Sequence, residues 1–249
     1  MIQDIHSHTY YSFCGKDKPE TLIEAAIAGG IEVLGICDHN YGIGFGRKEF
    51  YKSESEISNE DYERTLVRYF DHISLLKEKY ADRIKILRGI EIATTLTRDR
   101  VLLPEKTPVF FFDYALVEHI LPIKDSAIAG DLLGFAKRVG CPLGIAHTDL
   151  FAFIDELGED PKDYLARMAK AGIFWELNVS FDSIHHYHEH EYVAAFFESR
   201  EQQELVRASG LKMSVGFDSH KADEYRADRV REACERLSEL GIAQAFCEE

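Results

Sequence analysis

The chain has 249 residues, of which 45% are hydrophobic and 12% aromatic, so it can bury one large core or two smaller ones. Its formal net charge of −15 repels a phosphate backbone, and nucleic acid is therefore not an expected partner. No apolar stretch reaches the roughly 18 residues that span a membrane, and we find neither a secretion signal nor a CxxC pair, so we expect a cytoplasmic protein with free thiols.

Short apolar runs alternate with longer amphipathic segments along the whole chain. The runs predict strands at residues 2–5, 31–37, 84–92, 114–120, 142–146, 173–179 and 211–217. The segments between them predict helices at residues 18–28, 59–81, 126–139, 161–171, 193–208 and 222–240. This alternation is typical of an α/β fold with a parallel sheet. With no evident linker, we expect a single domain over residues 1–249, either a closed or nearly closed barrel or, alternatively, an open doubly wound sheet.

Side chains that bind metal ions stand at the carboxyl ends of these predicted strands. They are His6, His8, His39, Glu91, His119, His147, Asp218 and His220. Because the strand ends of a parallel barrel open into one mouth, we expect these groups to converge there. Two residues in an H-x-H or D-x-H pair also project from the same face of an extended segment.

The number and chemistry of these side chains predict a metal centre with more than one ion. Six imidazoles and two carboxylates exceed the three protein ligands of a typical catalytic zinc site. We therefore predict two or three divalent ions. Nitrogen and oxygen ligands without sulfur suit Zn, Mn or Fe better than Ca.

The motifs DIHSHT, ICDHN, RGIEI, EHI, AH and FDSH, in this order, resemble the polymerase and histidinol phosphatase (PHP) family nearly end to end. The resemblance implies a distorted (β/α)7 TIM-like barrel with a cluster of two or three metal ions. It implies that His6 and His8 share one ion with Glu91 and Asp218. It also implies that Glu91 bridges to a second ion, and that the remaining ligands complete the cluster. The second ion would take His119 and His147, and a further ion would take His39 and His220.

One departure from the family pattern concerns the loop after H-x-H. Many family members have an additional histidine there, whereas the loop TYYSFCGKDK of this chain has none. Three alternatives follow: Cys14 substitutes, Asp17 substitutes, or the ion at His39 is weak or absent.

The resemblance implies metal-dependent hydrolysis of a small phosphate monoester, with histidinol phosphate as the leading candidate. Divalent cations supply hydroxide at neutral pH and neutralise the phosphoryl oxygens in the transition state. Glu91 and Asp218 would act in catalysis through the metal cluster. Two alternatives stay open: a phosphodiesterase or exonuclease acting on nucleotides, which the acidic composition disfavours, and a non-catalytic metal-binding regulatory module.

Candidate groups for binding the rest of the substrate carry a weaker signal. Lys16 and Arg47 lie in loops that follow strand ends and would meet a phosphate, and the amide of Asn178 would orient a ligand. We interpret the histidine-rich segment at residues 185–190 as an exposed loop that enters a helix, with gating of the mouth or capture of another ion as the alternative. Asp38 would either accept a hydrogen bond from a ligand histidine or begin a turn.

Overall fold

The computed structural model describes residues 1–43, 59–95, 102–120, 126, 128 and 130–247. Within these ranges the strands form one parallel sheet in the order of the sequence. They are β1 (Gln3–Asp4), β2 (Val33–His39), β3 (Lys85–Ala93), β4 (Tyr114–Glu118), β5 (Leu143–Ile145), β6 (Ile173–Asn178) and β7 (Met213–Gly216). All seven predicted strands are confirmed, and β2 and β3 each extend beyond the predicted end by one or two residues.

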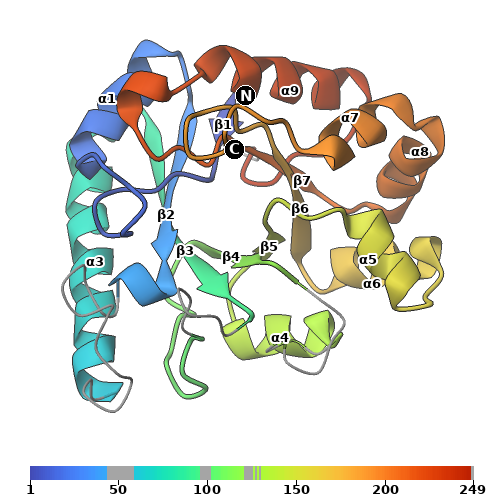
Figure 1. Ribbon diagram of the computed structural model, residues 1–249, viewed down its shortest axis with the longest axis horizontal. Helices are drawn as coiled ribbons and strands as arrows, with labels where there is room; N and C mark the ends of the chain where they lie inside the picture. Colours follow the sequence, from blue (N-terminus) through green and yellow to red (C-terminus); the bar gives the residue numbers. More distant parts are fainter. Residues whose placement is uncertain (44–58, 96–101, 121–125, 127, 129, 248–249) are drawn as a thin grey trace.

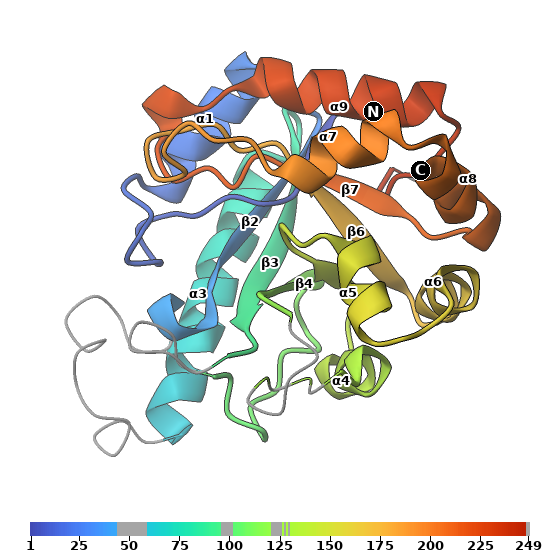
Figure 2. The same ribbon diagram turned by 45° about the vertical axis from the view of Figure 1, so that its right-hand side comes forward.

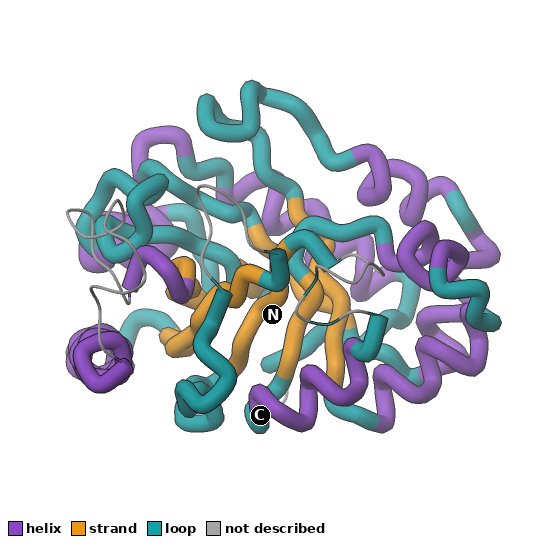
Figure 3. Tube along the Cα trace, turned by 60° about the horizontal axis from the view of Figure 1, so that its bottom comes forward, coloured by secondary structure: helices purple, strands orange, loops and turns teal. Residues whose placement is uncertain are grey.

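Hydrogen bonds between the first and last strands close the sheet into a nearly complete barrel. The amide of Ile5 donates to the carbonyl of Val215 at 3.0 Å, and that of Asp218 donates to His6 at 2.8 Å. A parallel bridge between Ser7 and Ser219 continues this contact. The barrel prediction is therefore confirmed, and the open doubly wound sheet is wrong. Figure 3 shows the strands in the middle of the molecule with helices and loops around them.

Helices surround the barrel in the described part of the chain (Figure 1). They are α1 (Pro19–Ala28), α3 (Asn59–Lys79), α4 (Leu132–Val139), α5 (Leu150–Glu156), α6 (Pro161–Lys170), α7 (Glu191–Glu198), α8 (Arg200–Ser209), α9 (Ala227–Glu239) and the short 3-10 helix η2 (Ala222–Glu224). Helix α1 contacts β2, α3 contacts β3 and α6 contacts β6. Helix α9 lies along β1 and β7, near the closure of the barrel (Figure 2). No helix in the described ranges combines the length and apolarity needed to cross a bilayer.

Side-chain caps explain two differences from the predicted helices. The predicted helix 193–208 is two helices, because Ser199 ends α7 and its hydroxyl accepts from the backbone of α8. The predicted helix 126–139 begins only at Leu132, where the Asp131 carboxylate accepts from the first turn. A side chain that satisfies a free N–H group fixes the start of a helix more precisely than apolar periodicity does.

Helix α5 was not predicted, and α9 starts later than predicted. Asp149 accepts a hydrogen bond from the amide of Ala152 at 3.0 Å and thereby begins α5, which is only seven residues long. The predicted helix 222–240 consists of η2 and, after a break at Tyr225 and Arg226, α9. Short helices contain too few turns for their apolar spacing to stand out.

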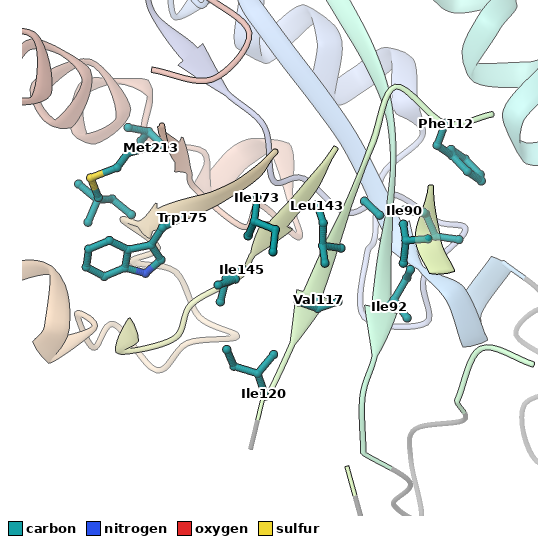
Figure 4. Close-up of a cluster of buried hydrophobic side chains, with 14 of the residues drawn as sticks. Ile90, Ile92, Phe112, Val117, Ile120, Leu143, Ile145, Ile173, Trp175 and Met213 are labelled. Carbon is teal, nitrogen blue, oxygen red and sulfur yellow. The ribbon is translucent and has the colours of Figure 1, made fainter. Parts of the chain in front are cut away.

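The apolar core has two layers, one on each face of the sheet. Side chains on the outer face pack against the helices, and Figure 4 shows part of this layer with Ile90, Ile92 and Val117. A separate cluster fills the interior of the barrel. Its members are Ile5, Val33, Cys37, Leu87, Tyr114, Leu116, Ala146, Phe174 and Ala245. A Cβ on either Gly35 or Gly89 would lie within 2.5 Å of Tyr114, so the two glycines make room for this ring.

The side chains that face the barrel interior change from apolar to ionisable along β2 and β3. Alternation in β2 places Val33, Cys37 and His39 on one face, in that order toward the carboxyl end. Alternation in β3 does the same for Leu87 and Glu91. Because the register pairs His39 with Glu91, their side chains meet at the carboxyl end of the barrel.

Candidate metal centre

The carboxyl ends of the strands surround a cavity of about 570 Å³, called the cup below. Except for His6, which lies fully buried beneath it, every predicted metal ligand lines the cup. Additional lining comes from Cys14, Glu118, His185 and His190.

The densest part of the cup brings together four predicted ligands. The Nε2 atoms of His6 and His8 lie 3.1 Å apart, and Asp218 Oδ1 lies 3.5 and 3.0 Å from them, respectively. The two oxygens of Glu91 each lie 3.4 Å from one of these nitrogens. Ligands about 2.0–2.2 Å from a common cation lie about 3.0–3.5 Å from one another. His6, His8 and Asp218 thus have the mutual spacing of ligands to one ion, and Glu91 lies beside the two imidazoles.

A second part of the cup surrounds the other edge of Glu91. His147 Nε2 lies 3.2 Å from Glu91 Oε1, and the ring of His119 lies 5.2 Å from that of His147. The imidazole of His119 is 42% exposed and contacts Glu118 Oε2 at 3.1 Å. His119, His147 and Asp218 have φ of 52°, 27° and 55°, a strained conformation that proteins retain mainly at functional sites.

The third part of the cup contains His39 and Cys14. His39 Nδ1 lies 2.7 Å from Glu91 Oε2 and 3.6 Å from Glu118 Oε1. Ligand atoms of Cys14, His8 and His39 all lie within 4.8 Å of one another. Burial opposes ionisation of the Cys14 thiol, but His8 and His39 nevertheless lower its pKa to about 5. Glu118 was not a predicted ligand. Cys14 was predicted only as one possible substitute for the missing loop histidine.

Several buried atoms of the cup have no hydrogen-bond partner among the described residues. They are His39 Nδ1, Glu91 Oε2, Asp218 Oδ1 and His220 Nδ1. The 2.7 Å contact of His39 with Glu91 lacks hydrogen-bond geometry. Buried polar atoms are nearly always paired, and a buried charge without a partner is costly. Divalent cations would satisfy all four atoms, so the residues present fit a metal cluster.

The electrostatics of the cup agree with this fit. Burial disfavours charge on His6, but nearby carboxylates, that of Asp218 first, raise its pKa well above the usual value. Burial would raise the pKa of Glu91, but His39 and His6 hold it well below the usual range. The pKa of Asp218 is likewise held low, against burial, by His6 and His220. The carboxylates are therefore ionised and available as ligands.

Glu176 on β6 supports the cup from below and was missed by the sequence analysis. It is fully buried, and its Oε1 lies 2.8 Å from His6 Nδ1. Its Oε2 accepts from the amide of His147 at 2.8 Å. Such a carboxylate fixes the orientation of a ligand imidazole and makes it more basic. The available signal was a single Glu in an otherwise apolar strand.

Of the predicted substrate contacts, the two that the structure describes, Lys16 and Asn178, do not line the cup. Asn178 is buried, donates to Glu176 at 3.3 Å and accepts from the amide of Ser180 at 3.1 Å. It therefore caps the local backbone and contacts Glu176, whereas its predicted contact with a ligand or substrate stays a prediction. Lys16 is exposed and lies outside the lining of the cup. Arg47 lies outside the described residues.

The histidine-rich segment divides into two kinds of residue. His186 and His188 are exposed, as predicted for a surface loop. The prediction is wrong for His185 and His190, which line the cup. His185 bridges two carboxylates, with Asp182 Oδ1 2.7 Å from Nδ1 and Asp218 Oδ2 3.0 Å from Nε2. Burial lowers the pKa of His190 to about 4.

Comparison with known proteins places the chain in a family. The model of the PHP domain matches residues 4–248. The chain belongs to the PHP family. It is 28% identical over 93 residues to the histidinol-phosphatase of Lactococcus lactis subsp. lactis strain IL1403, a match that covers 37% of this chain and only 30% of that relative.

Two solved structures share the fold over most of the chain. One is the histidinol phosphate phosphatase of the same Lactococcus strain, complexed with zinc, L-histidinol and phosphate, at 19% identity and a TM-score of 0.58. The match covers 97% of this chain and 94% of that one. The other is the hisK protein of Listeria monocytogenes, at 18% identity, a TM-score of 0.52 and coverage of 89% and 96%. These likenesses confirm the distorted barrel of the family.

Proposed function

We propose that this protein is a metal-dependent phosphoesterase that hydrolyses a small phosphate monoester, with histidinol phosphate as the leading candidate. The observation that carries the proposal is the convergence of the eight predicted ligands in and directly beneath one cup, where four buried carboxylate and imidazole atoms have no hydrogen-bond partner among the described residues. The resemblance to the Lactococcus enzyme, which is named a histidinol-phosphatase and binds zinc, L-histidinol and phosphate, supports this substrate class.

Two or three divalent ions, Zn, Mn or Fe, would bind in the cup. His6, His8 and Asp218 would hold one ion, because their ligand atoms lie close to one another, and Glu91 would join them from beside the two imidazoles. Glu91, together with His147 and His119, would also hold a second. When bound, such ions supply positive charge to phosphoryl oxygens and lower the pKa of a bound water.

The protein supplies orientation and shape to this chemistry. Glu176 accepts the Nδ1 proton of His6 and so presents Nε2 to the cup. Phe13 and Tyr41 form an aromatic wall beside His39, with the ring centroid of Tyr41 4.7 Å and that of Phe13 6.2 Å from the imidazole. This wall would contact the organic part of a substrate and exclude water from that side.

The other candidate activities have less support. The net charge of −15 disfavours a long nucleic acid as a substrate and hence an exonuclease. The feature that favours a regulatory module is the absence of a histidine from the loop after His8, but Cys14 of that loop lines the cup. Because all five cysteines are free, we expect the protein to act in the cytoplasm.

The test is turnover by metal-loaded protein on histidinol phosphate, p-nitrophenyl phosphate and a phosphodiester analogue. We expect release of phosphate from the monoesters, loss of activity in EDTA, and recovery on adding zinc or manganese. Turnover of the diester alone would replace the proposal with the phosphodiesterase. Metal binding without any turnover would replace it with the regulatory module.

A further inference from the structure

The loop between β1 and α1 carries a thiol into the cup. Cys14 lines the cavity, and its Sγ lies within 4.8 Å of ligand atoms of both His8 and His39. The ring of His8 lies 4.4 Å from that of His39 and 4.8 Å from that of His220. The thiol thus faces a group of imidazoles and not an apolar pocket.

Hydrogen bonds hold this loop in place on the amino-terminal side of Cys14. The carboxylate of Asp38, at the end of β2, accepts from the amides of Thr9 and Ser12 at 2.7 and 3.0 Å. The Ser12 hydroxyl in turn accepts from the amide of His39 at 2.9 Å. Among the described residues, the carboxylate of Asp38 accepts from Thr9 and Ser12 and from no ligand histidine, so it fixes the loop that carries the thiol.

The carboxyl-terminal side of Cys14 is fixed as well. A Cβ on Gly15 would lie 2.0 Å from the carbonyl oxygen of Thr9, so only glycine lets the loop fold back this closely. The amide of Lys16 then donates to the carbonyl of His220 at 2.9 Å. The loop is consequently attached to both strand ends that carry the neighbouring imidazoles, which positions the thiol before any ligand binds.

Asp17, the alternative substitute for a loop histidine, has a different role. Its Oδ2 accepts from the amide of Ala222 at 2.8 Å and attaches the loop to the segment after β7. It belongs to none of the groups of converging ligand atoms found among the described residues. The geometry therefore favours the thiol over the carboxylate.

We propose that Cys14 Sγ is, with His39, a thiolate ligand of a metal ion at the edge of the cup beside His8 and His220. Among the described residues, His39 has a buried ring nitrogen without a hydrogen-bond partner, and its ligand atom converges with those of Cys14 and His8, which points to a ligand at this position. The proposal rests on the proposed function only in requiring that the cup binds metal ions.

The thiolate sets the metal preference of this position. Thiolate is a soft ligand that favours zinc, and cobalt as its spectroscopic substitute, whereas manganese and magnesium favour oxygen ligands. The ion at the edge of the cup is therefore zinc in preference to manganese. Replacing the thiolate with an imidazole weakens that preference.

Cobalt(II) titration of the metal-free protein, followed by absorption spectroscopy, tests the proposal. We expect visible d–d bands from cobalt in the cup and, in addition, a near-ultraviolet thiolate-to-cobalt charge-transfer band. The charge-transfer band disappears in Cys14→Ser and in Cys14→His, while d–d bands persist. Cys141→Ser is the matched control, since Cys141 is a partly buried free thiol outside the cup, and it keeps the band.

The outcomes separate this proposal from the proposed function. A charge-transfer band that survives in folded Cys14→Ser and Cys14→His, or d–d bands without any charge transfer in the unmodified protein, overturns the role of Cys14 and leaves the metal centre intact. Failure to bind cobalt at all overturns both. Circular dichroism shows whether each variant is folded, and Cys14→His provides a second test if Cys14→Ser does not fold.

Discussion

The lower half of the barrel interior lies toward the amino ends of the strands, and the upper half, which includes the cup, lies at their carboxyl ends. The two halves differ in how their polar groups are satisfied. In the lower half, Val33, Leu87 and Phe174 pack together, and the buried hydroxyl of Tyr114 donates to the carbonyl of Ile5. In the upper half, buried carboxylates and imidazoles crowd together, and several of their atoms have no hydrogen-bond partner in the part of the chain that the structure describes. The same strands supply both halves. The lower half stabilises the fold. The buried charged groups of the upper half lower the stability of the fold, and a bound ligand would offset that loss.

The largest expected effect is the loss of turnover when a metal ligand is removed from the upper half. We expect Glu91→Gln and Asp218→Asn each to lower turnover by at least about a hundredfold, because the charge that holds the cations at the reacting phosphoryl group is lost. Bound metal, measured by elemental analysis after dialysis, falls in parallel. Glu201→Gln, on the exposed surface of α8, should retain both. Activity of either cup variant close to that of the unmodified protein would contradict the ligand assignment.

Shortening a side chain in the lower half should lower stability and leave metal binding unchanged. We expect Leu87→Ala to lower the free energy of unfolding by about 2–5 kcal/mol, because it leaves a cavity in the barrel interior. The number of bound ions per folded chain should not change. Urea unfolding measures the first quantity and elemental analysis the second. Leu75→Ala, at a 65% exposed position on α3, is the control and should change stability by less than about 0.5 kcal/mol.

Glu176 lies between the two halves, so a variant at this position tests whether metal affinity can fall while the fold is retained. Glu176→Gln keeps the shape of the side chain but weakens its acceptance of the His6 proton. We expect the affinity for zinc to fall by about 10–100-fold, as for other groups that orient metal ligands, with the fold retained. Competition with a coloured chelator measures the affinity. An unchanged zinc affinity would mean that His6 does not need this support.

The smallest expected change in stability comes from Asp113, a carboxylate outside the barrel interior that is paired with Arg88. Burial would raise the pKa of Asp113, but hydrogen bonds from Arg88 lower it to about 2. Because the folded-state pKa lies below the unfolded value of about 3.9, ionised Asp113 stabilises the fold above pH 4, and this contribution is lost as the pH falls toward 2.

The corresponding variant is Asp113→Asn. We expect it to lower the free energy of unfolding by about 1–2 kcal/mol near pH 6, allowing for partial solvent screening. The difference from the unmodified protein should shrink as the pH falls below 4. Urea unfolding at several pH values gives both quantities, and a difference that does not depend on pH would contradict the role of the ion pair.

The sequence predicted the barrel and the side chains that converge at its mouth because both depend on local periodicity. Alternation along β2 and β3 determines that His39 and Glu91 face inward, and parallel pairing brings them together. Glu118 and Glu176 were missed because a single acid in an apolar strand carries no spacing signal. The side chain's inward direction becomes evident only when the register is known.

The loops were predicted less well because their conformation depends on contacts across the fold. His185 reaches the cup because Asp182 and Asp218 bind its two nitrogens, and these carboxylates follow different strands. Asp38 positions Ser12 and its loop through hydrogen bonds across 26 residues of sequence. Neither relationship follows from the spacing of residues along the chain.

Anomalous X-ray diffraction from crystals grown with saturating zinc tests the central claim most directly. We expect two or three anomalous peaks inside the cup, one of them between His6, His8, Glu91 and Asp218. An empty cup, or zinc bound only elsewhere on the surface, would contradict the metal centre and the phosphoesterase built on it.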